Sequence, residues 1–139
     1  MQNEIDALTQ FAFKNTTSLT ADSYGQKPIA KQNPEKFEQL VTEFTDIIDR
    51  RIETLTYRIE KDYTKQLQIL GERIGIMKGK PRDVIDIYTG VLTKKVKEVS
   101  SAKIKVYRDE GRLLVLELMG HLASFYRKYY TGVIKEERT

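Results

Sequence analysis

The last helix that the sequence predicts carries apolar residues on two of its faces. Between residues 107 and 130, apolar side chains recur at steps of three and four, the spacing of an α-helix. One stripe comprises Tyr107, Gly111, Leu114, Leu118, Leu122, Phe125 and Tyr129, and the other comprises Leu113, Leu116, Met119, Ala123, Tyr126 and Tyr130. A helix on the surface of a monomer needs only one apolar stripe to meet its core. The second stripe therefore predicts cover by another copy or by a partner protein.

We expect this helix to form the contact between two copies of the chain. A contact between identical surfaces is the commonest closed arrangement of protein subunits. The sequence therefore predicts a homodimer with the last helix at its interface. The expected interface residues are Leu114, Leu118, Leu122 and Phe125.

Three more helices are predicted before the last one. Apolar residues at helical spacing indicate helices over 34–60, 63–78 and 81–99, and a last helix over 102–130 that ends at Thr131 and Gly132. Asn33 is suited to cap the first helix, and Pro34 to begin it. No segment shows the sustained two-residue alternation of a strand. The expected fold is all-α, a four-helix bundle-like domain that dimerises through its helices.

Glycines mark the second of these helices at a four-residue spacing. Gly71 and Gly75 each lower helix stability by about 1 kcal/mol relative to alanine. Close approach of another helix would compensate for that cost. Gly79 is expected to end the helix in the left-handed conformation.

One packed domain is expected, over residues 34–131. Residues 1–33 hold a stretch rich in Ser and Thr, followed by Gly25 and Pro28, which interrupt regular structure. We therefore expect a poorly ordered arm, or one that is ordered only by docking on a surface. Residues 132–139 are expected to form a charged tail.

The composition argues against a catalytic site. The chain has no Cys and a single His, His121, so it lacks the ligands of a typical zinc site. It contains neither a nucleophile elbow nor a phosphate-binding loop. We expect no enzyme activity, metal or cofactor. The sequence shows no membrane span and no secretory signal, so the cytoplasm is the expected location.

The formal net charge of +4 leaves a second function open. Basic residues are densest over 78–82 and 94–97, and elsewhere they alternate with acidic ones. A basic helical dimer that binds nucleic acid would need a concentrated basic face. This is the alternative to a module that binds protein, and steep salt dependence of binding would identify it.

Four segments of the third and fourth predicted helices form a pattern that is found in a known family. They are Arg82-Asp83-Val84-Ile85-Asp86-Ile87-Tyr88, Glu110-Gly111-Arg112-Leu113, Gly120-His121-Leu122 and Tyr126-Arg127. In these segments the chain resembles the C-terminal domain of the KaiA family of circadian clock proteins. The segment Leu70-Gly71-Glu72-Arg73 and the basic turn after it are also similar to the N-terminal domain of the phosphatase regulator RsbU. The resemblance covers about residues 34–131.

This resemblance implies a dimeric helical domain that binds a regulatory partner. In clock proteins the partner is a C-terminal peptide of the KaiC ATPase, and in RsbU it is a kinase-like switch protein. A groove in a helical dimer also suits a peptide on physical grounds. Polar and aromatic residues beside an apolar helix are favoured binding anchors. The partner site is therefore expected to comprise His121, Arg112, Tyr126, Arg127, Asp86 and Tyr88.

Overall fold

The computed structural model describes residues 27–58 and 63–138, with side chains up to Tyr129. These residues form five helices and no strand, which confirms the predicted all-α class for the described part of the chain. In chain order, the helices are α3 (Ile29–Gln32), α4 (Pro34–Tyr57), α5 (Tyr63–Ile76), α6 (Pro81–Glu98) and α7 (Ser101–Arg138).

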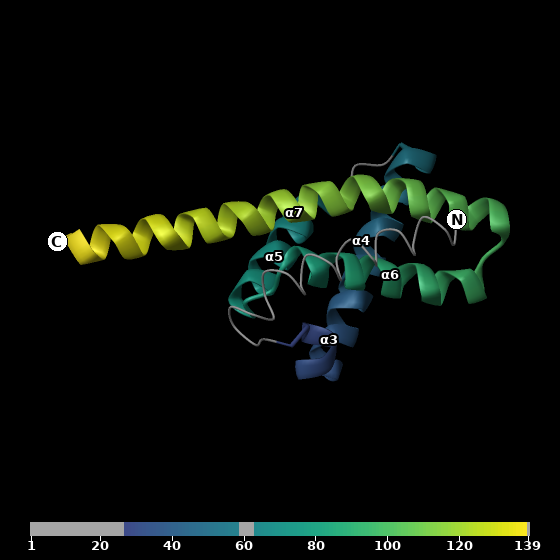
Figure 1. The fold of residues 1–139 in the computed structure, drawn as a ribbon. Coiled ribbons are helices and arrows are strands. Elements are labelled where there is room, and N and C mark those ends of the chain that lie inside the picture. Colours follow the sequence, from purple (N-terminus) through teal and green to yellow (C-terminus); the bar gives the residue numbers. More distant parts are fainter. Residues whose placement is uncertain (1–26, 59–62, 139) are drawn as a thin grey trace.

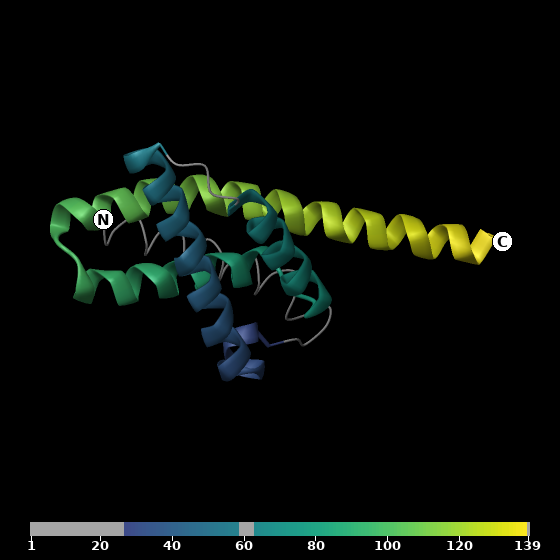
Figure 2. The ribbon, with the colours of Figure 1, turned by 180° about the vertical axis from the view of Figure 1, so that it is seen from behind.

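The helices form two crossed layers. A short turn at 99–100 joins α6 and α7, which lie side by side and run in opposite directions (Figure 1). Both α4 and α5 lie across this hairpin on the same side, as the view from behind shows (Figure 2). The core lies between the layers. Its fully buried side chains include Leu40, Phe44, Ile48, Leu67, Leu70, Ile74, Ile87, Tyr88, Leu92, Leu114 and Leu118.

Most of the first apolar stripe of α7 lies in this core, although Tyr129 at its end is 63% exposed. Leu114 and Leu118 are fully buried and Leu122 is 3% exposed, while Phe125 is half-buried against Gly75. The expectation that Leu114, Leu118 and Leu122 form a dimer interface is therefore corrected, while the same expectation for the half-buried Phe125 stays a prediction. The physical reason is that α4, α5 and α6 together supply enough apolar surface to cover the stripe from within the same chain.

The glycines of α5 allow α7 to approach closely, as the sequence predicts. A Cβ atom at Gly71 would lie 2.7 Å from the Cβ atom of His121, well inside van der Waals contact. A Cβ atom at Gly75 would overlap the ring of Phe125. The helix whose close packing offsets the propensity cost of these two glycines is therefore α7 of the same chain.

Helix starts agree with the sequence more closely than helix ends do. The side chain of Asn33 accepts a hydrogen bond from the Lys36 amide at 3.2 Å, and Pro34 is the first residue of α4. The end of α5 differs from the expectation, because Lys78 adopts the left-handed conformation (φ 59°) in place of Gly79. The Lys78 and Gly79 amides donate to the Gly75 and Ile74 carbonyl groups, which closes the helix.

Position 79 needs a glycine because of the limited space around it, and not because of its backbone conformation. A Cβ atom there would overlap the side chain of Ile74 and lie 3.2 Å from Cδ1 of Ile29. Ile29 belongs to α3 and is only 3% exposed. The packed region therefore begins upstream of the expected boundary at Pro34. Residues 1–26 of the arm expected over 1–33 lie outside the described residues.

The last helix continues beyond its expected end. It passes through Thr131 and Gly132 and reaches Arg138, so the prediction that these two residues close it is wrong. The yellow segment of α7 projects beyond the rest of the domain as a single helix (Figure 1). Residues expected as a charged tail thus have a helical backbone.

The substitution Lys78→Gly should stabilise the domain. A side chain in the left-handed region costs about 1 kcal/mol that glycine avoids, so the free energy of unfolding should rise by roughly that amount. Urea unfolding followed by circular dichroism measures the change. Lys78→Ala is the matched control, because it shortens the side chain but keeps Cβ. Equal stability of the two variants would contradict the assignment of strain to Lys78.

Candidate functional site

The six residues expected at a partner site do not share one surface. Tyr88 is 1% exposed, and its hydroxyl donates a hydrogen bond to the Arg108 carbonyl oxygen at 2.8 Å. The ring packs where a Cβ atom of Gly111 would otherwise lie. Tyr88 therefore joins α6 to α7 inside the core. Its assignment to a partner site is corrected, because a buried ring cannot contact a partner.

Tyr126 also makes an internal contact. Its hydroxyl donates to the Gly79 carbonyl oxygen at 2.6 Å, and its ring meets that of Phe125 edge-on at 5.7 Å between centroids. Burial raises the pKa of Tyr126, and the negative charge of Asp83 adds to the effect. The ring is half-buried, so Tyr126 ties α7 to the turn between α5 and α6.

His121 and Asp86 are half-buried on different elements. The Cβ atom of His121 packs on Gly71 at the contact between α5 and α7. Asp86 lies on α6, with its Oδ2 atom 3.7 Å from Nε of Arg82. Burial raises the pKa of Asp86 to about 6; the charge of Arg82 opposes this shift, and that of Asp83 adds to it.

The neighbouring carboxylate, Asp83, is buried and fully engaged. Its two oxygens accept hydrogen bonds from the Ile29 amide at 2.9 Å and the Lys80 amide at 2.8 Å. Asp83 thus caps α6 and holds α3 against it. No local sequence pattern points to the contact of Asp83 with Ile29, which lies 54 residues away.

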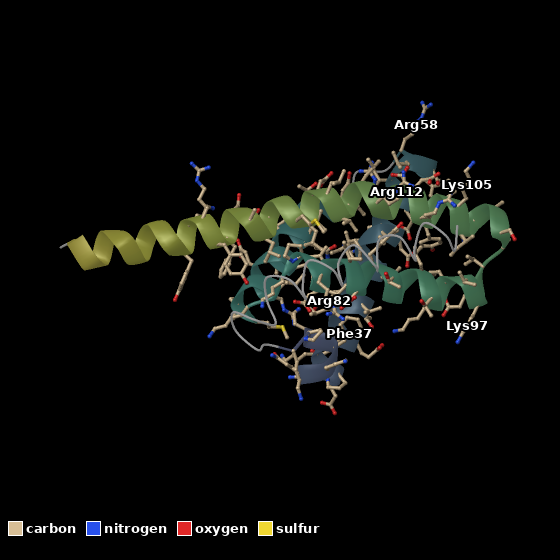
Figure 3. The ribbon with its side chains drawn as sticks, in the orientation of Figure 1. Phe37, Arg58, Arg82, Lys97, Lys105 and Arg112 are labelled. Atoms are coloured by element: carbon tan, nitrogen blue, oxygen red, sulfur yellow. The ribbon has the colours of Figure 1, made fainter. Side chains whose placement is uncertain are left out.

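Arg112 and Arg127 lie on the side of α7 that faces away from the domain. Both side chains are exposed, and Figure 3 shows Arg112 pointing away from the layer of α4 and α5. Leu113 and Leu116 lie beside Arg112, and they are 48% and 68% exposed. We call this surface the outer face of α7. Its exposed members are Asp109, Arg112, Leu113, Leu116, Gly120, Ala123 and Arg127.

The second apolar stripe is therefore divided. Leu113, Leu116 and Ala123 are exposed on the outer face, whereas Met119 and Tyr126 pack against the core. Gly120 is the residue that our sequence reading missed. A Cβ atom at Gly120 would meet nothing within 4 Å, so no contact within the described chain accounts for a glycine there.

A cleft lies away from this face, between the ends of α4 and α6 and the start of α7. It has a volume of about 470 Å³ and is lined by Asp49, Ile52, Glu53, Thr56, Tyr57, Lys95, Lys103 and Tyr107. The Tyr107 hydroxyl donates to Oδ1 of Asp49 at 2.5 Å, and the Lys95 ammonium lies 4.9 Å from the centroid of the Tyr107 ring. Lys95 is also 3.8 Å from Asp49, so internal pairs already use several of these groups.

Within the described ranges 27–58 and 63–138, no three His, Cys, Asp or Glu side chains gather to hold a metal ion. No helix among these residues has both the length and the apolar character needed to cross a membrane. Comparison with known proteins found no matching family model, no matching curated protein and no matching solved structure.

The substitution Asp86→Asn should raise stability at pH 7.5 and leave it unchanged near pH 3. The folded-state pKa of about 6 lies above the ordinary value of 3.8 for an aspartate, so the folded protein binds this proton more tightly than the unfolded chain does. The resulting stabilisation is present below pH 4 and is lost as the pH rises through 6. Because asparagine does not ionise, the variant keeps its stability over this pH range.

Chemical unfolding at a series of pH values measures this effect. The wild-type protein should lose stability relative to Asp86→Asn between pH 4 and pH 6. Asp46→Asn is the matched control, because the Asp46 side chain is 58% exposed. A constant difference between Asp86→Asn and the wild type across the whole range would show that the ionisation of Asp86 is not its cause.

Proposed function

We propose that this protein is a non-catalytic, homodimeric regulatory module that binds a partner protein or peptide near its dimer interface. The observation that carries the proposal is the outer face of α7, with Leu113 and Leu116 exposed on a long helix. Single exposed apolar residues are ordinary, but neighbouring ones on one helix face favour association. Gly120 supports the same interpretation, because its cost of about 1 kcal/mol to the helix has no compensation within the described chain.

The projecting end of α7 supports association as well. A helix that packs against nothing is marginally stable in water, and most helices in proteins depend on tertiary packing. The end of α7 extends away from the other helices (Figure 2). A second helix along α7 would supply packing to this segment and would cover the outer face at the same time. We therefore propose that the bundle-like assembly is completed by a second copy.

The class of partner follows from the resemblance to KaiA-type and RsbU-type domains. It favours the C-terminal peptide of a KaiC-type ATPase, or a kinase-like switch protein. Arg112 and Arg127 are exposed beside the proposed dimer contact, and His121 lies half-buried at its edge. Arginine is enriched among residues that dominate binding. These three residues remain our candidates, while Tyr88 is no longer one.

The substitution Leu116→Glu should dissociate the dimer. It places a charge on the most exposed leucine of the outer face, where it would be desolvated against the second copy. Light scattering should give twice the chain mass of 16.2 kDa for the wild type and the single mass for the variant. Ile76→Glu is the matched control, because Ile76 is 71% exposed on α5 and should tolerate the change.

Circular dichroism should show that both variants keep the helical spectrum of the wild type. The proposal of a dimer fails if the wild type is monomeric at micromolar concentrations. If Ile76→Glu dissociates the dimer and Leu116→Glu does not, the interface lies on α5.

Partner binding should depend on Arg112. Fluorescence titration with a labelled C-terminal peptide of a KaiC-type ATPase measures it. Truncation of one anchor costs about 2 kcal/mol, so Arg112→Ala should weaken binding roughly thirtyfold. Lys97→Ala is the control, since Lys97 is exposed on α6. Equal affinity of both variants would remove Arg112 from the site. Affinity that falls steeply with salt for single-stranded DNA, with no peptide binding, would favour the nucleic-acid alternative.

A further inference from the structure

The outer face of α7 repeats with a seven-residue period. Asp109, Leu113, Leu116, Gly120, Ala123 and Arg127 follow one another at alternating steps of four and three, and all six are exposed. This is the spacing of the seam in a two-stranded coiled coil. The stripe of α7 that contains Leu114, Leu118 and Leu122 is buried in the core of its own chain. The outer face is a separate row of residues, which is exposed and can contact another helix.

We infer that this seam pairs with the same seam of a second copy that runs antiparallel, centred at the level of residue 118. The inference rests on the proposed dimer and specifies its geometry. Each residue then faces the one that lies equally far beyond position 118 on the other helix. Leu116 faces Gly120, Leu113 faces Ala123, and Asp109 faces Arg127.

Side-chain size favours this register. Each leucine lies opposite a glycine or an alanine, so the two backbones approach evenly along the contact. The open space at Gly120 is then filled by Leu116 of the second copy, which accounts for a glycine that no contact within the described chain explains. Small residues that receive large ones are the usual means of close helix packing, as Gly71 and Gly75 show within this chain.

Charge favours the same register. Asp109 and Arg127 close the two ends of the apolar centre, and the antiparallel pairing brings opposite charges together at both ends. A parallel pairing in register would instead place Asp109 against Asp109 and Arg127 against Arg127. Like charges across an interface select against that arrangement. A shift of one seven-residue repeat places Asp109 opposite Gly120, or Arg127 opposite Leu116, and loses the ion pairs.

The projecting end of α7 also agrees with antiparallel pairing (Figure 1). In that arrangement, the end that projects from one copy runs along the start of α7 in the other copy. It would gain there the packing that the described residues of its own chain do not supply.

Cross-linking distinguishes the two directions. The chain contains no Cys, so single cysteines report unambiguously. Leu113→Cys and Ala123→Cys proteins are mixed and treated with a short bismaleimide. In the antiparallel dimer these two positions face each other, whereas two copies of position 113 lie about 15 Å apart along the axis at 1.5 Å per residue. We expect cross-links between the two variants and few within either one. A parallel dimer gives the opposite pattern and overturns the inference.

Charge reversal tests the register. Asp109→Arg or Arg127→Asp alone should raise the dimer dissociation constant about tenfold, since each places like charges at both ends of the contact. The double variant should restore the wild-type constant, and Lys97→Asp is the matched control. Sedimentation equilibrium measures these four variants and the wild type.

The outcomes separate the two proposals. A wild-type protein that is monomeric removes both the dimer and this geometry. A wild-type dimer that shows neither cross-link leaves the dimer standing and overturns the outer face as its contact. A dimer that cross-links between positions 113 and 123 but shows no recovery in the double variant overturns the ion pairs as the determinant of register.

Discussion

The close approach of α7 to α5 is the contact on which the rest of the arrangement depends. Gly71 and Gly75 let the α7 backbone come near enough for His121 and Phe125 to pack directly on α5. This contact fixes the rotation of α7 about its own axis. Once the side with His121 and Leu122 is turned inward, Leu113 and Leu116 must face outward, since they lie on the opposite side of the same helix. The exposed surface is thus a consequence of two glycines on another element.

Tertiary contacts around Gly79 also hold α7 in place against the turn between α5 and α6. Its carbonyl oxygen accepts from Tyr126, and its missing side chain makes room for Ile29. The turn between α5 and α6 is therefore fixed from α7 on one side and from α3 on the other. Asp83 adds hydrogen bonds to the amides of Ile29 and Lys80 in the same region. A buried carboxylate is tolerated there because backbone amides satisfy both of its oxygens.

The sequence was enough to predict where the helices lie, but not which helices pack against one another. Periodicity located four long helices, and Asn33 and Pro34 located a helix start, because these signals are local. Periodicity also predicts two apolar stripes on α7. The stripe with Leu114 and Leu118 was expected to pack on a second copy, but it packs in the core of its own chain. A stripe records that a face is apolar, and it does not record which helix packs on it. Tyr88 was misassigned for the same reason.

Other features depended on space that no local pattern encodes. Lys78 carries the left-handed conformation, and the adjacent Gly79 is required for its small volume, against Ile74 and Ile29. Gly120 was inconspicuous in the sequence among the other glycines. Its significance appears only when the structure shows Gly71, Gly75 and Gly111 each in contact with a named side chain and Gly120 with none. The difference between these glycines is what points to a surface for a second chain.

The proposed contact has the strength expected of a regulated dimer. Its apolar centre contains two leucines from each copy, which are 48% and 68% exposed before pairing, so burial of their remaining surface contributes about 1 kcal/mol each. That sum is of the same order as the loss of translational and rotational freedom on association. The ion pairs at its two ends set direction more than affinity, since exposed pairs add little. The fraction of such a dimer changes with protein concentration. A partner that contacts Arg112 of one copy and the outer face of the other would favour the paired state. Binding of a regulatory peptide and pairing of α7 would then be linked, because each stabilises the surface that the other needs.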